Sequence, residues 1–300
     1  MNIFARVLKD SVSHNNKRLI TMEIEYPRFI LAELNTHRML SKNSASSRAI
    51  PTKAMREHVM QDPALPVHWG QNQPGMQAHE EVADKARALT LWHAAKESAC
   101  YYNEQFEAMG VHKQIANRVT EPWMTMKTVI SGTEWANFFY LRNHKDAQPE
   151  IAALAKCMFH AQEESTPELL YPGEWHVPYI DTIRHAATGT LEYYVGDHIV
   201  DQELAIKVSA SCCAQVSYRK TDDSIGKALR IYDQLINSKP AHASPVEHQA
   251  TPIDDKYYED PATYMWPNGV SHQDKYGYLW SGNFCDWIQY RKTIQGEAQW

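Results

Sequence analysis

The densest group of side chains able to do chemistry lies in thirteen consecutive residues, from Thr36 to Arg48. This segment carries three cations, one imidazole and six hydroxyl or amide side chains. Such a composition can surround a phosphate or diphosphate with charge-assisted and backbone hydrogen bonds. A solvated, serine-rich loop is the alternative interpretation from composition alone.

The order of these residues is more specific than their composition. The pattern His-Arg-x-x-Ser-x-Asn-x-x-Ser-x-Arg resembles the signature of the flavin-dependent thymidylate synthases, the ThyX family. Later blocks at residues 117–122 and 137–151 resemble the family's Arg-x-x-x-Pro element and its Asn-Phe-x-x-Leu-Arg…Ala-Gln-x-Glu-Ile helix pair. Several blocks in the right order make the resemblance far more specific than one motif does.

Two further blocks match the family in an unexpected place. Cys213–Tyr218 and His242–His248 resemble the Ala-Arg-Val-Ser-Tyr/Phe and His-x-Thr-Pro-Phe-Glu-His segments that open a usual member. Here they come last, so the resemblance implies a circularly permuted relative, an arrangement tolerated where termini lie close together on the surface. We expect one catalytic domain over 1–300, in which 1–160 is the flavin and nucleotide half, 200–250 holds the permuted motifs and 251–300 is a C-terminal extension.

The resemblance implies a role for each matching residue. Arg142 and Glu33 are implied as catalytic residues that contact the pyrimidine. The nucleotide phosphate is implied to bind Ser46, Arg48 and Arg118, since a planar guanidinium suits phosphate oxygens bidentately. The flavin is implied to lie against His37, Arg38, Asn43, Asn137, Leu141, His242 and Ser244.

Arg142 has the sharpest role. Carbon C5 of a pyrimidine attacks an electrophile only when electron density is pushed into the ring, and preorganised cationic donors stabilise that enolate-like state. Classical thymidylate synthase instead adds a cysteine to C6. None of the five cysteines here lies in the Pro-Cys-x-His context of that enzyme, which fits a mechanism without covalent protein catalysis. We interpret Cys212 and Cys213 as small helix-packing residues.

Glu33 stands where the family commonly has a glutamine facing the pyrimidine. An ionised carboxylate only accepts hydrogen bonds, so it suits the exocyclic amine of cytosine, whereas a protonated one imitates glutamine. A solvated acid on a helix face is the other interpretation. Further departures from the family pattern are Thr36, Ser44, Thr133 and Gln215.

The leading hypothesis is transfer of a one-carbon unit from methylenetetrahydrofolate to C5 of a pyrimidine deoxynucleoside monophosphate. With deoxyuridylate (dUMP), FAD and NADPH, the family reaction gives thymidylate. One alternative makes 5-hydroxymethyl or 5-methyl deoxycytidylate from deoxycytidylate (dCMP). Another is a degenerate nucleotide-binding protein without catalysis. The resemblance also implies a homotetramer with active sites at subunit interfaces.

The elements that must position these residues follow from the spacing of apolar side chains. Residues 20–26 alternate apolar and polar, which predicts a half-buried strand ended by Pro27. We expect an α/β (α+β) fold with helices packed on a central mixed or antiparallel sheet. Helices are predicted at 28–38, 82–110 (a long core helix), 146–159 and 223–236, and long loops at 60–77 and 238–276.

Composition narrows the class of protein. The 300 residues carry a formal net charge of −6 and are 43% hydrophobic, which predicts a soluble globular protein. A mildly acidic total argues against generic binding to nucleic acid or to anionic membranes. The cysteine count is odd and contains no CxxC pair, and neither a leader nor a membrane span is expected, so we predict reduced thiols and a cytoplasmic location. No metal site is predicted.

Overall fold

The structure is a computed structural model that describes residues 3–217, 224–238, 241–259 and 265–297. At its centre lies a five-stranded sheet with the order β3-β4-β2-β1-β5, which is antiparallel except for the parallel pair of β1 with β5. The predicted α+β fold with a mixed central sheet is confirmed. The strands are β1 (Phe4–Ser13), β2 (Arg18–Pro27), β3 (Ser41–Ser44), β4 (Thr125–Gly132) and β5 (Glu168–Leu170).

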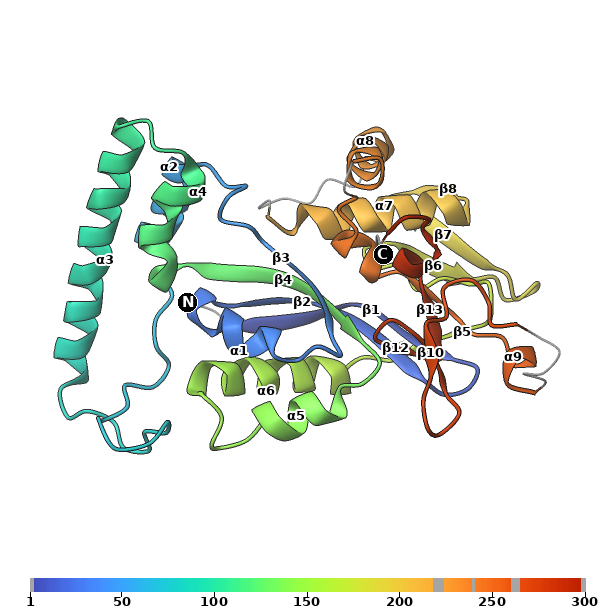
Figure 1. Cartoon of the computed structure of the whole chain (residues 1–300), viewed down its shortest axis with the longest axis horizontal. Coiled ribbons are helices and arrows are strands. Elements are labelled where there is room, and N and C mark those ends of the chain that lie inside the picture. Colours follow the sequence, from blue (N-terminus) through green and yellow to red (C-terminus); the bar gives the residue numbers. More distant parts are fainter. Residues whose placement is uncertain (1–2, 218–223, 239–240, 260–264, 298–300) are drawn as a thin grey trace.

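Helices cover both faces of this sheet (Figure 1). On one face, α5 (Ala136–Arg142) and α6 (Pro149–Glu163) pack against the apolar side chains of β2 and β4. On the other face lies α7 (Gln202–Ala214), where Cys213 packs on Val129 of β4. Both Cys212 and Cys213 are fully buried, as predicted.

The prediction of a half-buried strand at 20–26 is wrong in one respect. β2 is a strand and ends at Pro27, but its polar positions Thr21 and Glu23 are buried together with the apolar ones. The reason is the second helical layer, because a strand covered on both faces has no solvent side. Thr21 Oγ1 is satisfied by Ser131 Oγ at 2.6 Å across the strand pair.

The helix predicted at 28–38 is shorter than expected. A 3₁₀ turn, η1 (Arg28–Ile30), leads into α1 (Leu31–Asn35). Thr36 Oγ1 donates to the carbonyl of Glu33 at 2.6 Å and offers that carbonyl a partner outside the helix. His37 and Arg38 therefore lie in a turn between α1 and β3.

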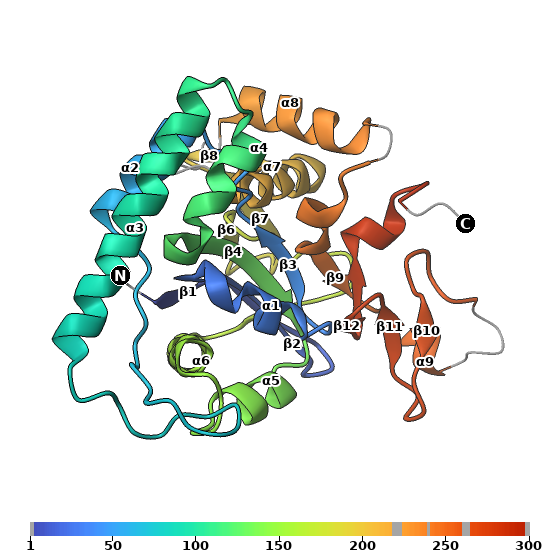
Figure 2. The same ribbon diagram turned by 60° about the vertical axis from the view of Figure 1, so that its left-hand side comes forward.

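The long helix α3 (Lys85–Ala108) is not a core helix, which corrects the prediction for 82–110. Only Lys96, Cys100 and Asn103 of α3 are buried, and Figure 2 shows the helix along the outer edge of the molecule. Its apolar stripe meets the small cluster around Trp123 and Met124, and Trp92 of the stripe also contacts the rings of Phe29 and Trp69. The neighbouring elements are α2 (Thr52–Gln61), α4 (Lys113–Ala116) and η2 (Asn117–Trp123).

The C-terminal half adds helices and small sheets beside the central sheet. The predicted helix at 223–236 is confirmed as α8 (Ile225–Ile236), and 146–159 is confirmed as α6. The remaining elements are β6 (Asp181–Arg184), β7 (Leu191–Val195), β8 (His198–Val200), η3 (Gln215–Ser217), η4 (Ser244–Glu247), β9 (Ala250–Pro252), α9 (Lys256–Glu259), β10 (His272–Gln273), β11 (Leu279–Ser281), β12 (Phe284–Cys285), β13 (Trp287–Gln289) and η5 (Tyr290–Thr293). The described residues of 238–276 are not one long loop, since η4, β9, α9 and β10 interrupt them.

Candidate functional site

The motif segment at 36–48 forms the edge of the central sheet. Its strand β3 pairs with β4 from Ser41 opposite Ser131 to Ser44 opposite Thr128. Because side chains alternate along a strand, the polar motif is divided between two faces. Ser41 and Asn43 contact the C-terminal half of the chain, whereas Lys42 and Ser44 line a cavity beside α1.

Asn43 connects three segments that are distant in sequence. Its Nδ2 donates to the carbonyl of Cys213 at 2.6 Å, and Ser244 Oγ donates to its Oδ1 at 3.2 Å. Both C-terminal motif blocks thus lie against the motif segment at 36–48, although Tyr218 of the first block lies outside the described residues. His242 is exposed just before η4.

Arg142, the last residue of α5, contacts the turn that precedes β3. Its Nε donates to His37 Nε2 at 2.7 Å, and its Nη2 lies 3.3 Å from Thr36 Oγ1. Burial, aided by the charges of Arg142 and Lys42, lowers the pKa of His37 to about 4. The imidazole is therefore neutral near pH 7 and accepts the guanidinium hydrogen bond, with Phe138 edge-on against its ring.

Arg142 and Glu33 line one cavity of about 850 Å³. The opposite wall comes from the loop predicted at 60–77 and includes His68 and Met76. Glu33 Oε2 is buried and has no hydrogen-bond partner among the described residues. A solvated acid on a helix face would not have a buried, unpaired oxygen. This geometry therefore favours a Glu33 carboxyl group whose Oε2 can accept a hydrogen bond from a ligand.

A second cavity, of about 340 Å³, gathers the residues predicted to bind phosphate. Ser46, Arg48 and Arg118 line it together with two cations that the motif comparison did not assign, Arg28 and Lys42. Arg118 and Arg28 both pair with Glu121, at 2.7 and 2.9 Å. Arg48 is exposed, and no ion pair to it occurs within the described ranges.

Lys42 is a partly buried cation of this second cavity. Its Nζ donates to the carbonyls of His37 at 2.5 Å and Leu40 at 3.1 Å. Burial lowers the pKa of Lys42 to about 8, while Glu247 opposes the shift. Sequence reasoning counted this lysine among the cations of the motif without giving it a role, because its burial depends on residues brought there by the fold.

Arg38 lies in a third cavity, of about 390 Å³, on the other side of Lys42. Asn35 and Lys42 line both the second and the third cavity, so the two are neighbours. Asn137 and Leu141, predicted to touch the flavin, are exposed on α5 and do not line the three cavities described here.

The residues predicted to hold the base and the phosphate of one nucleotide therefore lie in different cavities of this single chain. Glu33 and Arg142 share the first cavity, and Ser46, Arg48 and Arg118 share the second. The turn η1 and the helix α1 separate the two cavities: Phe29 and Glu33 line one, while Arg28 and Leu31 line the other.

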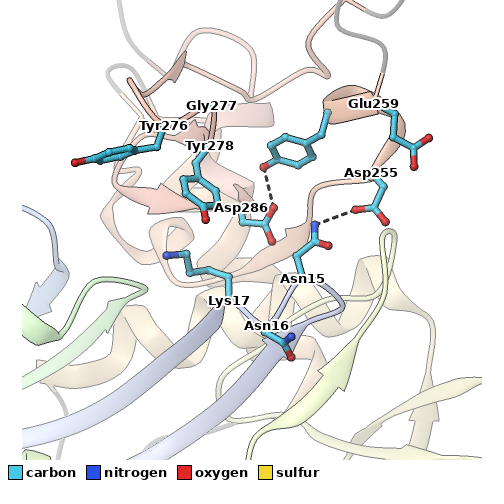
Figure 3. Close-up of a pocket in the computed structure, with 10 residues that line it drawn as sticks. Asn15, Asn16, Lys17, Asp255, Glu259, Tyr276, Gly277, Tyr278 and Asp286 are labelled. Atoms are coloured by element: carbon cyan, nitrogen blue, oxygen red, sulfur yellow. Dashed lines mark hydrogen bonds between the residues drawn. The ribbon is translucent and has the colours of Figure 1, made fainter.

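A further cavity, of about 620 Å³, lies away from all predicted residues (Figure 3). The β1–β2 turn, α9 and the hairpin at 272–281 line it, and buried Asp286 accepts from Ser13 Oγ at 2.7 Å and from Tyr258 at 2.8 Å. No motif in the sequence signals this cavity, because its walls come from four separate segments, the fourth of which contributes Asp286.

The described residues contain neither a metal-binding cluster nor a membrane-spanning helix. No group of three or more His, Cys, Asp or Glu side chains is placed to hold a metal ion. Within the same described ranges, no helix combines the length and the apolar character needed to cross a bilayer.

Comparison with known proteins gives the class. The family model Thy1, thymidylate synthase complementing protein, matches residues 13–168, just over half of the chain. The chain belongs to this family, the flavin-dependent thymidylate synthases, as the motifs predicted. Membership supports C5 methylation of a pyrimidine nucleotide as the general activity.

Two solved structures of one protein are also similar to this chain. They are the UMP/dUMP methylase PolB from Streptomyces cacaoi bound with 5-Br dUMP and with 5-Br UMP. The TM-score is 0.45 for both, with 15% and 16% identity, over 54% of this chain and 91% and 89% of theirs. No curated protein matches the sequence.

Proposed function

We propose that the protein transfers a one-carbon unit from methylenetetrahydrofolate to C5 of a pyrimidine deoxynucleoside monophosphate, with FAD as its flavin and NADPH as reductant where the reaction is reductive. The observation that carries the proposal is the family match over 13–168, which contains every predicted residue except those of the two C-terminal blocks. The cations gathered at the second cavity support a phosphate-bearing substrate.

The residues present fit a flavin dinucleotide. Arg38 and Lys42 supply positive charge in the third cavity, where a diphosphate needs it, and Asn43 and Ser244 are fixed beside it by their mutual hydrogen bond. When bound, the flavin supplies the hydride that converts a transferred methylene into a methyl group. Arg38, Asn43 and Ser244 are the residues that would hold it.

Arg142 is proposed to stabilise charge on the pyrimidine. Neutral His37 accepts from Nε and so fixes the plane of the guanidinium without cancelling its charge. Among the described residues Nη1 has no hydrogen-bond partner, so it is available to a carbonyl oxygen in the first cavity. A fixed cationic donor at that oxygen stabilises the negative charge that develops as C5 becomes nucleophilic.

Glu33 supports dCMP as a second candidate substrate. Its buried, unpaired Oε2 would accept from the exocyclic amine of cytosine, whereas an ionised carboxylate would set two acceptors against each other at uracil O4. An unmatched buried polar group costs about 1–3 kcal/mol, which is about ten- to a hundredfold in discrimination. The product from dCMP would be 5-hydroxymethyl or 5-methyl dCMP.

The test combines substrate, cofactor and one substitution. The protein is incubated with methylenetetrahydrofolate, FAD and either dUMP or dCMP, with and without NADPH, and products are identified by mass. We expect modification of at least one monophosphate, and Glu33→Gln should shift the ratio of turnover toward dUMP by about ten- to a hundredfold.

Three outcomes of this test would contradict parts of the proposal. An unchanged ratio in Glu33→Gln would show that Glu33 does not read the base. Glu57→Gln is the matched control, since Glu57 is an exposed helical acid outside the cavities described above. Binding of nucleotide without any product would favour the degenerate nucleotide-binding protein, and thymidylate as the sole product would exclude dCMP.

A homo-oligomer, tetrameric by family resemblance, is part of the proposal. The separation of the base and phosphate residues in one chain supports it, because a second copy beside α1 would bring the two groups to one nucleotide. The exposed apolar side chains of α3, among them Leu91, Tyr101 and Tyr102, also support an interface. Sedimentation equilibrium of the purified protein measures the number of subunits in this oligomer.

A further inference from the structure

Two segments that are far apart in sequence build the third cavity. One wall is the motif segment, with Arg38, Ser41 and Lys42, and the other is the C-terminal extension, with Arg291 and Lys292. The extension carries none of the family motifs found in the sequence. Its contribution to this cavity therefore comes from the fold alone.

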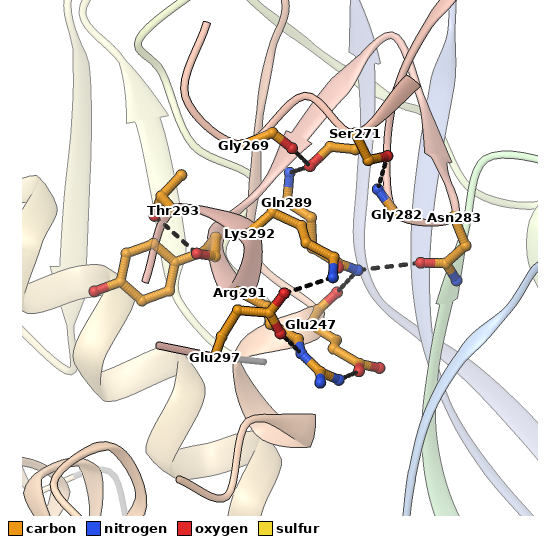
Figure 4. A network of polar contacts seen from close by, with 12 residues as sticks. Glu247, Gly269, Ser271, Gly282, Asn283, Gln289, Arg291, Lys292, Thr293 and Glu297 are labelled. Carbon is orange, nitrogen blue, oxygen red and sulfur yellow. Dashed lines mark hydrogen bonds and ion pairs between the residues drawn. The ribbon is translucent and has the colours of Figure 1, made fainter. Parts of the chain in front are cut away.

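Side-chain amides fix the extension to the motif segment, and Figure 4 shows one of these amides, that of Gln289, hydrogen-bonded to Glu247 and Asn283. Gln289 is buried, and its Nε2 donates to the carbonyl of Glu247 at 2.9 Å and to Ser41 Oγ at 3.2 Å. Asn283 Nδ2 donates to the same Ser41 Oγ at 3.0 Å. The two walls are thus held together by buried and partly buried hydrogen bonds, so the cavity is a built feature of the fold.

A glycine permits the close approach of Lys292. Gly282 has φ +61°, which favours glycine, and a Cβ there would lie 3.2 Å from Lys292 Cε and 3.3 Å from Gln289 Oε1. A side chain at this position would require Lys292 and Gln289 to shift by a few tenths of an ångström. Glycine thus allows the backbone of the extension to pass close to both side chains.

The cavity is positively charged even after its ion pairs are counted. Arg291 pairs with Glu247 of η4 and, through Nε at 2.6 Å, with Glu297. Lys292 pairs with Glu297 at 2.6 Å. Two carboxylates oppose four cations, since Arg38 and Lys42 also line the cavity, and no ion pair to Arg38 occurs in the described part of the chain.

We propose that the C-terminal extension completes an anion site in which Arg291 and Lys292, together with Arg38 and Lys42, bind a phosphate or diphosphate. Glu297 holds Arg291 and Lys292 in place when no ligand is bound, and the ligand competes with its carboxylate for the same donors. The source of the anion is the flavin diphosphate or the phosphate of the nucleotide. The identity of the ligand rests on the proposed function, whereas the existence of an anion site rests on the geometry of the cavity.

Because the ligand competes with Glu297, the two kinds of substitution should change the ligand affinity in opposite directions. A purely structural role predicts no such opposite changes. Replacing a cation that binds the ligand lowers the ligand affinity, while Glu297→Gln frees both cations and raises that affinity. If the ion pairs only stabilised the fold, both kinds of change would lower stability and neither would alter affinity. The measurements are equilibrium dissociation constants for inorganic pyrophosphate, FAD, riboflavin and dUMP at fixed ionic strength.

We expect Lys292→Gln and Arg291→Gln to weaken pyrophosphate binding about tenfold and Glu297→Gln to tighten it several-fold. Lys275→Gln is the matched control, because Lys275 is an exposed cation of the extension outside the cavity. Lys292→Gln keeps the test valid if Arg291→Gln does not fold, since Arg291 has two carboxylate partners and Lys292 has one.

The other ligands separate the sources. If the substitutions of Arg291 and Lys292 lower the affinity for FAD but not for riboflavin, which has no phosphate, the site binds the flavin diphosphate. If they lower the affinity for dUMP alone, the site binds the phosphate of the nucleotide. If all ligands bind each variant as they bind Lys275→Gln, the anion site is overturned while FAD binding by the wild type still supports the proposed function. If the wild type binds pyrophosphate here but neither FAD nor dUMP, the proposed function fails and the anion site stands.

Discussion

The contact between Arg142 and His37 combines a cation with a base that stays neutral. Had His37 carried a proton, two positive groups would lie 2.7 Å apart and Arg142 would be displaced. The lowered pKa of His37, to about 4, removes that repulsion over the whole neutral range. The guanidinium is thereby oriented by a donor–acceptor contact that leaves its charge for a ligand.

Arg142→Ala is expected to abolish turnover while the fold remains intact. Loss of a fixed electrostatic contact to the developing ring charge costs about two to three powers of ten in kcat. The measurement is steady-state turnover with each monophosphate, together with a circular dichroism spectrum. Lys145→Ala is the control, because Lys145 is an exposed cation lining the same cavity. Turnover near that of the wild type would remove Arg142 from the mechanism.

At this scale the sequence identified the chemistry but not its spatial grouping. Ser46, Arg48 and Arg118 meet at one cavity because the first two are local neighbours and η2 returns beside them. Arg291 and Lys292 could not be found, since they reach the site through an extension without a motif. The roles assigned to all of these residues stay predictions, and Asn137 and Leu141, although they lie on α5 with Arg142, do not line the three cavities.

The strand β3 is the element that joins the two halves of the motif set. Asn43 is its central contact, because one amide binds both the end of α7 and the start of η4. The carbonyl of Cys213 is one of the last four of α7, which have no partner within the helix. Asn43 therefore acts as a side-chain cap across the sheet edge.

Asn43→Ala should lower the free energy of unfolding by about 1–3 kcal/mol, because it leaves the Cys213 carbonyl without its donor. Urea denaturation measures the change. Asn72→Ala, in an exposed loop, is the matched control and should have little effect. The connection between the halves would be refuted if Asn43→Ala and Asn72→Ala were equally stable.

Apolar spacing predicted the existence of elements better than their surroundings. α6 is buried as its stripe of Ile151, Leu154 and Met158 indicated. α3 has a similar spacing, yet it lies outside, because periodicity does not reveal what is available to cover a face. β2 is more buried than its alternating pattern predicts, because a second layer from the C-terminal half covers the face that was expected to meet solvent.

Across the whole molecule, a chain of buried polar groups crosses the central sheet. Ser11 and Thr21 contact the two ring nitrogens of His176 at 2.9 and 2.8 Å, and Ser131 joins Thr21 to His248. Burial lowers the pKa of both histidines, that of His248 to about 3. The sheet and the C-terminal half are thus connected through two neutral imidazoles.

These histidines predict a loss of stability in mild acid. Their folded pKa values lie below the unfolded value near 6.5, so below that pH the unfolded chain binds more protons and the free energy of unfolding falls. Each imidazole contributes up to about 1.4 kcal/mol per pH unit. Urea denaturation between pH 7 and 5 measures the slope. His248→Gln should reduce it, and an equal slope in that variant would count against the interpretation.

The permuted motif order is consistent with these long-range contacts but stays a prediction. Residues 213–217 and 242–248 come to β3 and β4 although the chain reaches them last. A motif is defined by local order, so the sequence alone revealed the blocks. Their contact depends on the fold, and only the tertiary structure places them beside the segment at 36–48.

The position of Lys42 in the wall between two cavities has a consequence for how ligands bind together. With a pKa of about 8, its ammonium gives up a proton easily, and an anion in either cavity would make that proton harder to remove. Each ligand then favours the charged form that the other needs. Their affinities should be positively coupled, by the same factor in both directions.

Titration calorimetry at pH 8 can detect this coupling. Binding of the first ligand should take up a fraction of a proton, so its heat should depend on the ionisation enthalpy of the buffer, and prior saturation with the second ligand should abolish that dependence. Lys42→Met should remove both the proton uptake and the coupling, and Lys275→Met should retain them. Independent affinities in the wild type would mean that the two cavities fill without regard to each other. Coupled affinities would mean that an anion in one cavity promotes the binding of an anion in the other.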